Sequence, residues 1–144
     1  MATAVVVRDL PASSDPVEVA GRERPGRLIA DVPRGGGTRR LLTLDVWGGL
    51  ALYVGWPDIH VLNDTRVDLY GAEGVELHRR LLRGEDVAAL EELCISDIVV
   101  LSSTPVVDKV RGSRWHRVAT QQLPEGRKAV HLVRVGVTPC DSDQ

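Results

Sequence analysis

The chain has 144 residues, of which 43% are hydrophobic and 26% are charged, and its formal net charge is −2. These values are ordinary for one soluble globular domain, and no apolar run approaches the roughly 18 residues of a membrane span. We therefore expect a single domain over residues 1–144, with residues 138–144 as a frayed tail. The N-terminus lacks a charged start followed by a long apolar core, so it is not predicted to be a secretory signal.

Cysteine and arginine usage bear on the origin of the chain. Cys94 and Cys140 lie far apart and match no metal or redox spacing, so we expect free thiols in a reducing cytoplasm. Lysine occurs twice against sixteen arginines, a bias that is typical of GC-rich coding genomes. The protein is therefore predicted to be cytoplasmic and bacterial.

β-structure is predicted for most of the first forty residues. Thr3–Leu10 is rich in β-branched residues and ends at a proline, which is typical of a strand. Val17–Arg24 is interpreted as a short strand, and Arg27–Val32 as another after the Pro25-Gly26 turn. Pro33–Arg40 predicts a flexible, basic hairpin tip, because a strand follows it rather than the helix that a phosphate-binding loop requires.

The stretch from Leu41 to Asn63 is the most apolar part of the chain. Gly48-Gly49 lies between two strand-like runs and is typical of a two-residue hairpin turn. Such a hairpin would be apolar on both faces, although a strand exposed on one side should alternate apolar with polar residues. We therefore expect the hairpin to be covered on both sides or to meet a second chain.

One face of this predicted hairpin is a candidate interface. Monomers rarely leave large apolar patches exposed, and large aromatic side chains often anchor interfaces. We therefore predict a homodimer or a higher closed oligomer. The alternative is that the N-terminal strands cover this face within one chain. The candidate interface residues are Trp47, Leu50, Leu52, Val54 and Trp56.

Two further strands and a helical hairpin are predicted next. Ile59–Leu62 and the alternating segment Arg66–Tyr70 are interpreted as strands that complete an antiparallel meander. The helical hairpin covers about residues 73–94, with Gly84 ending its first helix and Asp86 capping its second. Helical spacing predicts that it docks on the sheet through Leu77, Leu81, Val87, Leu90 and Leu93.

The last third of the chain is again predicted to be β-structure. Its strand-like segments are Ile95–Leu101, Val106–Arg111, Arg114–Thr120 and Lys128–Val137. Gly112-Ser113 is interpreted as a hairpin turn, and Pro124-Glu125-Gly126 as the next turn. The first of these strands follows two helices, so a crossover within a mixed sheet is also allowed.

Charge is unevenly spread along the chain. Asp45 to Asp108 holds twelve acids and four arginines, whereas Lys109 to Arg134 holds seven bases and one acid. The basic segment either folds against the acidic middle or forms a nucleic-acid-binding β-ribbon, in which a tryptophan stacks on a base. The candidate anion or nucleic-acid residues are Lys109, Arg111, Arg114, Trp115, Arg117, Arg127 and Lys128.

A small acid–base site is a further alternative. Asp58 and His60 share a strand face at i and i+2, and Asp64 follows that strand, so the three would form a catalytic set. No local motif places a serine or cysteine nucleophile, and the histidines lack a short metal-ligand spacing. We therefore expect no metal and no cofactor, and a hairpin end with solvated acids is the simpler interpretation.

Taken together, these patterns predict an α+β fold. It would be a mainly antiparallel β-sheet or barrel-like wrap of seven to nine strands, with one helical hairpin. The leading functional hypothesis is a small, non-catalytic cytoplasmic binding or assembly module that self-associates through the apolar hairpin face. The alternatives are a nucleic-acid-binding or regulatory protein that uses residues 109–134 and a small enzyme centred on His60.

Overall fold

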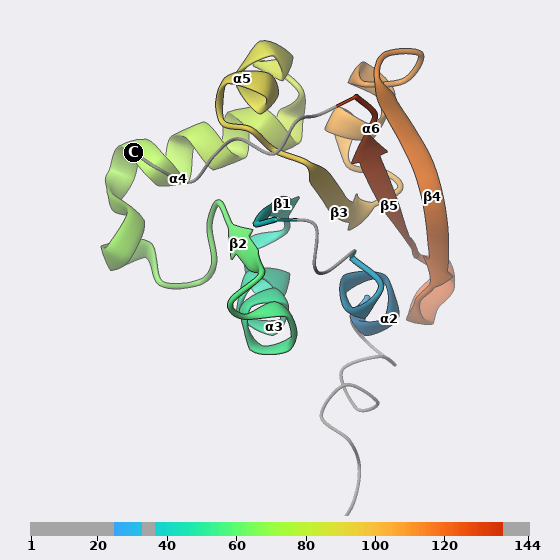
Figure 1. Ribbon diagram of the computed structural model, residues 1–144, viewed down its shortest axis with the longest axis horizontal. Coiled ribbons are helices and arrows are strands. Elements are labelled where there is room, and N and C mark those ends of the chain that lie inside the picture. The colour runs from blue at the N-terminus through green and yellow to red at the C-terminus, as the bar shows by residue number, and fades with distance from the viewer. Residues whose placement is uncertain (1–24, 33–36, 137–144) are drawn as a thin grey trace, which may run out of the picture.

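The computed structural model describes residues 25–32 and 37–136, which form an α+β fold with helices on both faces of a mixed sheet (Figure 1). The predicted strands Thr3–Leu10 and Val17–Arg24 and the predicted tail 138–144 lie outside the described residues. In chain order the elements are α2 (Gly26–Ala30), β1 (Arg39–Thr43), α3 (Asp45–Gly55), β2 (Ile59–Val61), α4 (Val67–Arg83), α5 (Val87–Glu92), β3 (Asp97–Leu101), α6 (Pro105–Lys109), β4 (Trp115–Gln122), the 3-10 turn η1 (Pro124–Gly126) and β5 (Lys128–Arg134).

The five strands are ordered β2-β1-β3-β5-β4. β1 runs parallel to β2 and to β3, whereas β5 runs antiparallel to β3 and to β4. Parallel neighbours need long crossovers, and here α3 joins β1 to β2, while α4 and α5 lead from β2 to β3. The prediction of a mainly antiparallel sheet or barrel-like wrap is therefore wrong, because the described sheet is mixed and open.

The apolar stretch from Leu41 to Asn63 is not a hairpin. It contains β1, α3 and β2, and Gly48-Gly49 lies inside the helix rather than in a turn. Leu44 is extended and its carbonyl accepts a hydrogen bond from the Gly48 amide at 3.1 Å, which begins the helix. A Cβ on Gly48 would lie 2.5 Å from the Asn63 carbonyl oxygen, so this glycine allows a close approach of two backbones.

The helical hairpin is present with the predicted break. Gly84 ends α4 in the left-handed conformation with φ 69°, and Asp86 is the N-cap residue of α5. The predicted strand Arg66–Tyr70 is wrong, however, because Val67 onward forms the first turn of α4. The residues predicted to dock the hairpin all join one core, Leu81 and Leu90 as buried members and the rest as partly buried neighbours: Leu77, Val87 and Leu93.

Two short apolar segments predicted as strands are helices. Arg27–Val32 overlaps α2, and Val106–Arg111 overlaps α6. Each segment has three buried residues at positions i, i+1 and i+4, which is a helical spacing. In an apolar run of five residues this spacing does not distinguish a helix from a strand. Pro105 at the start of α6 favours the helix, because a first-turn residue needs no amide donor.

The remaining β predictions are confirmed in outline. β3, β4 and β5 lie within or close to the predicted segments, and η1 forms the turn between β4 and β5. Gly112-Ser113 lies in the loop between α6 and β4 rather than in a strand-to-strand hairpin. Sheet residues alternate between two cores: Ile98 and Val100 face α4, α5 and α6, whereas Val99 faces α2 and α3.

The predictions of free thiols and of no membrane span can be compared with the structure. Cys94 is disulfide-bonded, so the prediction of a free thiol is wrong at this residue. The other cysteine, Cys140, lies outside the described residues. Within the described part of the chain, no helix combines the length and the apolar character that crossing a membrane requires.

Candidate functional site

The residues of the predicted acid–base site, Asp58, His60 and Asp64, are not hydrogen-bonded to one another in the described part of the chain. His60 is exposed on β2 and stacks on Trp56, with ring centroids 6.3 Å apart and an interplanar angle of 18°. Asp64 is buried and accepts hydrogen bonds from Nε and Nη2 of Arg66, the shortest at 2.6 Å. The Arg66 side chain also lowers the pKa of Asp64. Among the described residues, neither Asp58 nor Asp64 is hydrogen-bonded to His60.

A buried ion network surrounds Asp97 at the start of β3. Arg39 donates to both carboxylate oxygens at 2.8 and 3.1 Å, and His131 Nε2 donates to Oδ1 at 2.8 Å. Ser96 Oγ donates to Oδ2 at 2.7 Å. Burial raises the pKa of Asp97, but the hydrogen bonds from His131, Arg39 and Ser96 outweigh it, so the pKa lies below its ordinary value. Both carboxylate oxygens of Asp97 accept hydrogen bonds from neighbouring side chains, which indicates a structural role for Asp97.

A second buried histidine joins α4 to the carboxyl ends of β1 and β2. His78 Nε2 donates to the Thr43 carbonyl at 2.7 Å, so Nδ1 is the acceptor, 3.4 Å from the Asn63 amide nitrogen. Burial lowers the pKa of His78, which keeps the ring neutral. Across residues 25–32 and 37–136, no cluster of three or more His, Cys, Asp or Glu side chains suits a metal ion.

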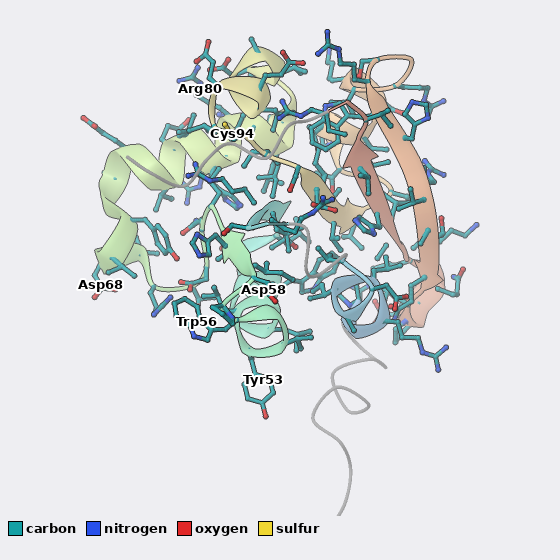
Figure 2. The ribbon with its side chains drawn as sticks, in the orientation of Figure 1. Tyr53, Trp56, Asp58, Asp68, Arg80 and Cys94 are labelled. Atoms are coloured by element: carbon teal, nitrogen blue, oxygen red, sulfur yellow. The ribbon has the colours of Figure 1, made fainter. Side chains whose placement is uncertain are left out.

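The outer face of α3 is exposed and apolar. Val46, Tyr53 and Trp56 are 56%, 70% and 72% exposed, and Gly49 lies between them on the same helix face. Figure 2 shows Tyr53 pointing away from the sheet. A groove of about 560 Å³ runs beside this face, and its lining residues are Leu52, Tyr53, Trp56, His60, Val61, Arg66 and Tyr70.

The predicted interface residues are divided by the helix. Trp47 and Leu50 are buried in the core beneath α3, and Val54 packs against that core. Leu52 and Trp56 instead line the groove. Strand periodicity therefore assigned buried and exposed residues to the same face. It missed Val46 and Tyr53, because positions 46, 49, 53 and 56 follow the helical spacing i, i+3, i+7 and i+10.

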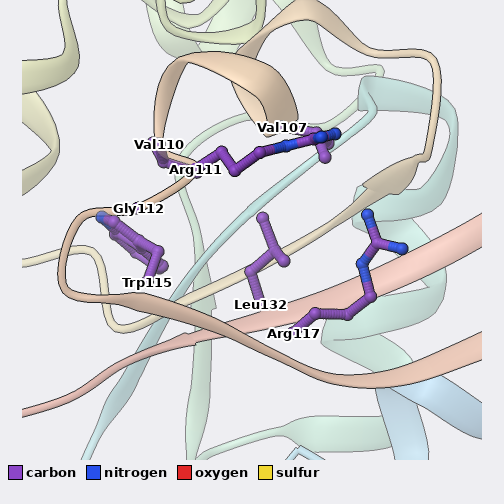
Figure 3. Close-up of a pocket in the computed structure, with 7 residues that line it drawn as sticks. All are labelled: Val107, Val110, Arg111, Gly112, Trp115, Arg117 and Leu132. Atoms are coloured by element: carbon purple, nitrogen blue, oxygen red, sulfur yellow. The ribbon is translucent and has the colours of Figure 1, made fainter.

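Three of the predicted basic-segment residues meet at a second pocket. Arg111, Trp115 and Arg117 line a cavity of about 360 Å³ between α6 and the β4–β5 pair (Figure 3). Lys109, Arg114, Arg127 and Lys128 do not line it. The loop between α6 and β4 brings Arg111 close to Trp115, and the antiparallel pairing of Arg117 with Leu132 places Arg117 beside the same cavity.

The chain matches no protein-family model, no curated protein and no solved structure.

Proposed function

We propose that this protein is a non-catalytic binding module that self-associates through the outer face of α3. The exposure of Val46, Tyr53 and Trp56 in one stripe carries the proposal. Large exposed aromatic residues in a contiguous apolar patch are typical of interaction surfaces. The helix is apolar on its buried side as well, and such a helix is usually covered all round.

The stripe is complementary to itself. Positions 46 and 56, and positions 49 and 53, are each symmetric about position 51. Two copies of α3 that cross antiparallel about a two-fold axis therefore place Val46 opposite Trp56 and Gly49 opposite Tyr53. Each contact sets a smaller side chain against a large aromatic ring, which is the arrangement that close packing requires.

Gly49 makes the crossing sterically feasible. A Cβ at this position would meet no atom within 4 Å, so the space above the helix is open to a partner. Interaxial distances between packed helices depend on the side chains at the contact, and a glycine permits a short one. The Tyr53 ring of the second copy is the occupant that we propose for this space.

The other predicted functions are less well supported. An enzyme centred on His60 is not favoured, because neither Asp58 nor Asp64 is hydrogen-bonded to this histidine among the described residues. A nucleic-acid-binding ribbon is not favoured, because four of its seven candidate residues lie away from the basic pocket. A cytoplasmic location rested on free thiols, and the disulfide at Cys94 removes that support.

Light scattering after gel filtration tests the proposal. The wild-type chain should have the mass of a dimer at micromolar concentration, and Tyr53→Asp should have the mass of a monomer. Tyr53 is exposed, so this variant should keep its fold and its circular dichroism spectrum. Val118→Asp is the matched control, because Val118 is a 57% exposed apolar residue on β4. It should leave the dimer intact.

A charge pair tests the geometry of the crossing. Gly49→Arg and Tyr53→Glu should each dissociate the dimer, whereas the double variant should restore it through two intermolecular ion pairs. A monomeric wild-type chain would contradict the proposal and favour cover of α3 from within the chain. A dimer that survives Tyr53→Asp but not Val118→Asp would move the interface to β4.

A further inference from the structure

The cavity beneath α6 is independent of α3 and has a distinct chemistry. Its floor is apolar, formed by Val107, Val110, Trp115 and Leu132. Trp115 is 8% exposed and the other three are more deeply buried, so the floor belongs to the main core. The volume of about 360 Å³ falls at the small end of the range for ligand pockets, roughly 300–1,000 Å³.

Two guanidinium groups stand over this floor. In Figure 3 the side chains of Arg111 and Arg117 extend toward the same end of the pocket, while the Trp115 indole lies near Gly112 at the other end. Arg111 donates to Asp108 at 2.7 Å, whereas Arg117 has no ion-pair partner in the described part of the chain. Of the two arginines that line the pocket, Arg117 is therefore the one without an ion-pair partner among the described residues.

We infer that this pocket binds a monocarboxylate carried on a compact apolar body. The planar fork of arginine donates two parallel hydrogen bonds to a carboxylate, and among residues 25–32 and 37–136 no carboxylate pairs with Arg117. The apolar body lies over Leu132 and against the edge of Trp115, the parts of these core side chains that line the pocket. One guanidinium without an ion-pair partner matches a single carboxylate, and the small volume favours a small ligand over a continuous polyanion.

Nuclear magnetic resonance titration with 3-phenylpropionate tests this site. Saturable shifts should occur at the Arg117 side chain and at the Trp115 indole N–H. The neutral analogue 3-phenylpropionamide has the same body, and it should bind at least about tenfold more weakly because it loses the charge-assisted hydrogen bonds. A parallel titration with a short oligothymidine tests a nucleic acid as the alternative occupant.

Two arginine variants separate this site from a general charge effect. Arg117→Gln should weaken binding of 3-phenylpropionate by about tenfold or more. Arg79→Gln, at an exposed position on α4, removes the same charge elsewhere and should leave binding unchanged. The inference is overturned by the absence of saturable binding, by equal binding of the amide, by an unchanged affinity in Arg117→Gln, or by tighter binding of oligothymidine at the same residues.

Discussion

The outer face of α3 differs from the outer face of α4 after the break at Gly71. The C-terminal end of α4 carries ion pairs, including Arg83 with Glu76 and Glu85 and Arg80 with Asp86, whereas the exposed apolar residues of α4, Val67 and Leu69, precede Gly71. On α3 the outer surface carries Val46 and aromatic rings instead, with Asp45 as the one charge of the helix. A charged outer face is complete in water, whereas an apolar one is complete only against a partner. This contrast is the reason for proposing the outer face of α3, and not that of α4, as the self-association surface.

The largest effect should come from the inner face of α4. Leu81 is 1% exposed in the main core, and Leu81→Ala should lower the free energy of unfolding by about 2–5 kcal/mol, measured by urea denaturation. Leu69→Ala is the control, because Leu69 is 64% exposed in the short helical segment of α4 that precedes the break at Gly71. Similar losses at the two leucines would show that α4 docks through a different face.

Adjacent glycines on α3 sharpen the comparison between inner and outer faces. Gly48→Ala should destabilise the fold by about 1–3 kcal/mol, because the new Cβ meets the backbones of Asn63 and Asp64. Gly49→Ala should stabilise it by about 0.5–1 kcal/mol, because its Cβ meets nothing within 4 Å and alanine favours a helix. Urea denaturation at a concentration where the chain is monomeric measures both. Changes of the same sign would place the inner face of α3 elsewhere.

The pH dependence of stability should report the contact that joins α4 to β1. Burial lowers the pKa of His78, so the unfolded chain binds a proton more readily than the folded chain does. The free energy of unfolding should therefore be fully present above about pH 6.5 and fall as the pH decreases below that value. Asp64 and Asp97, whose pKa values are also lowered, should add their losses only in a more acidic range, below about pH 4.

Urea denaturation between about pH 7.5 and about pH 5 measures this effect. His78→Gln should flatten the dependence, because the group that titrates is gone. His116→Gln removes an exposed histidine of β4 and should leave the slope unchanged. A wild-type slope that survives His78→Gln would assign the dependence to another residue. The pH dependence should be the smallest of the three expected effects, because protonation of His78 removes no packed atoms from the core.

Local sequence was sufficient for the elements whose signals do not overlap. The leucine spacing of α4 and α5 is long enough to exclude a strand, and Gly84 stops the first helix because it tolerates a positive φ. The turn at Pro124–Gly126 and the β-branched run of β3 are similarly unambiguous. Local sequence predicted a basic segment of seven candidate residues, of which the structure brings only Arg111, Trp115 and Arg117 to one pocket.

Tertiary structure decided the rest. The run around Gly48-Gly49 is apolar at both strand and helix periods, and what selects α3 is the parallel pairing of β1 with β2, together with the approach of Gly48 to Asn63. The ion network joins Arg39, Asp97 and His131, which are separated by 58 and 34 residues, so no local pattern brings them together. The sequence alone therefore showed that this region is apolar on all sides, and only the fold determined which side is buried and which side is exposed.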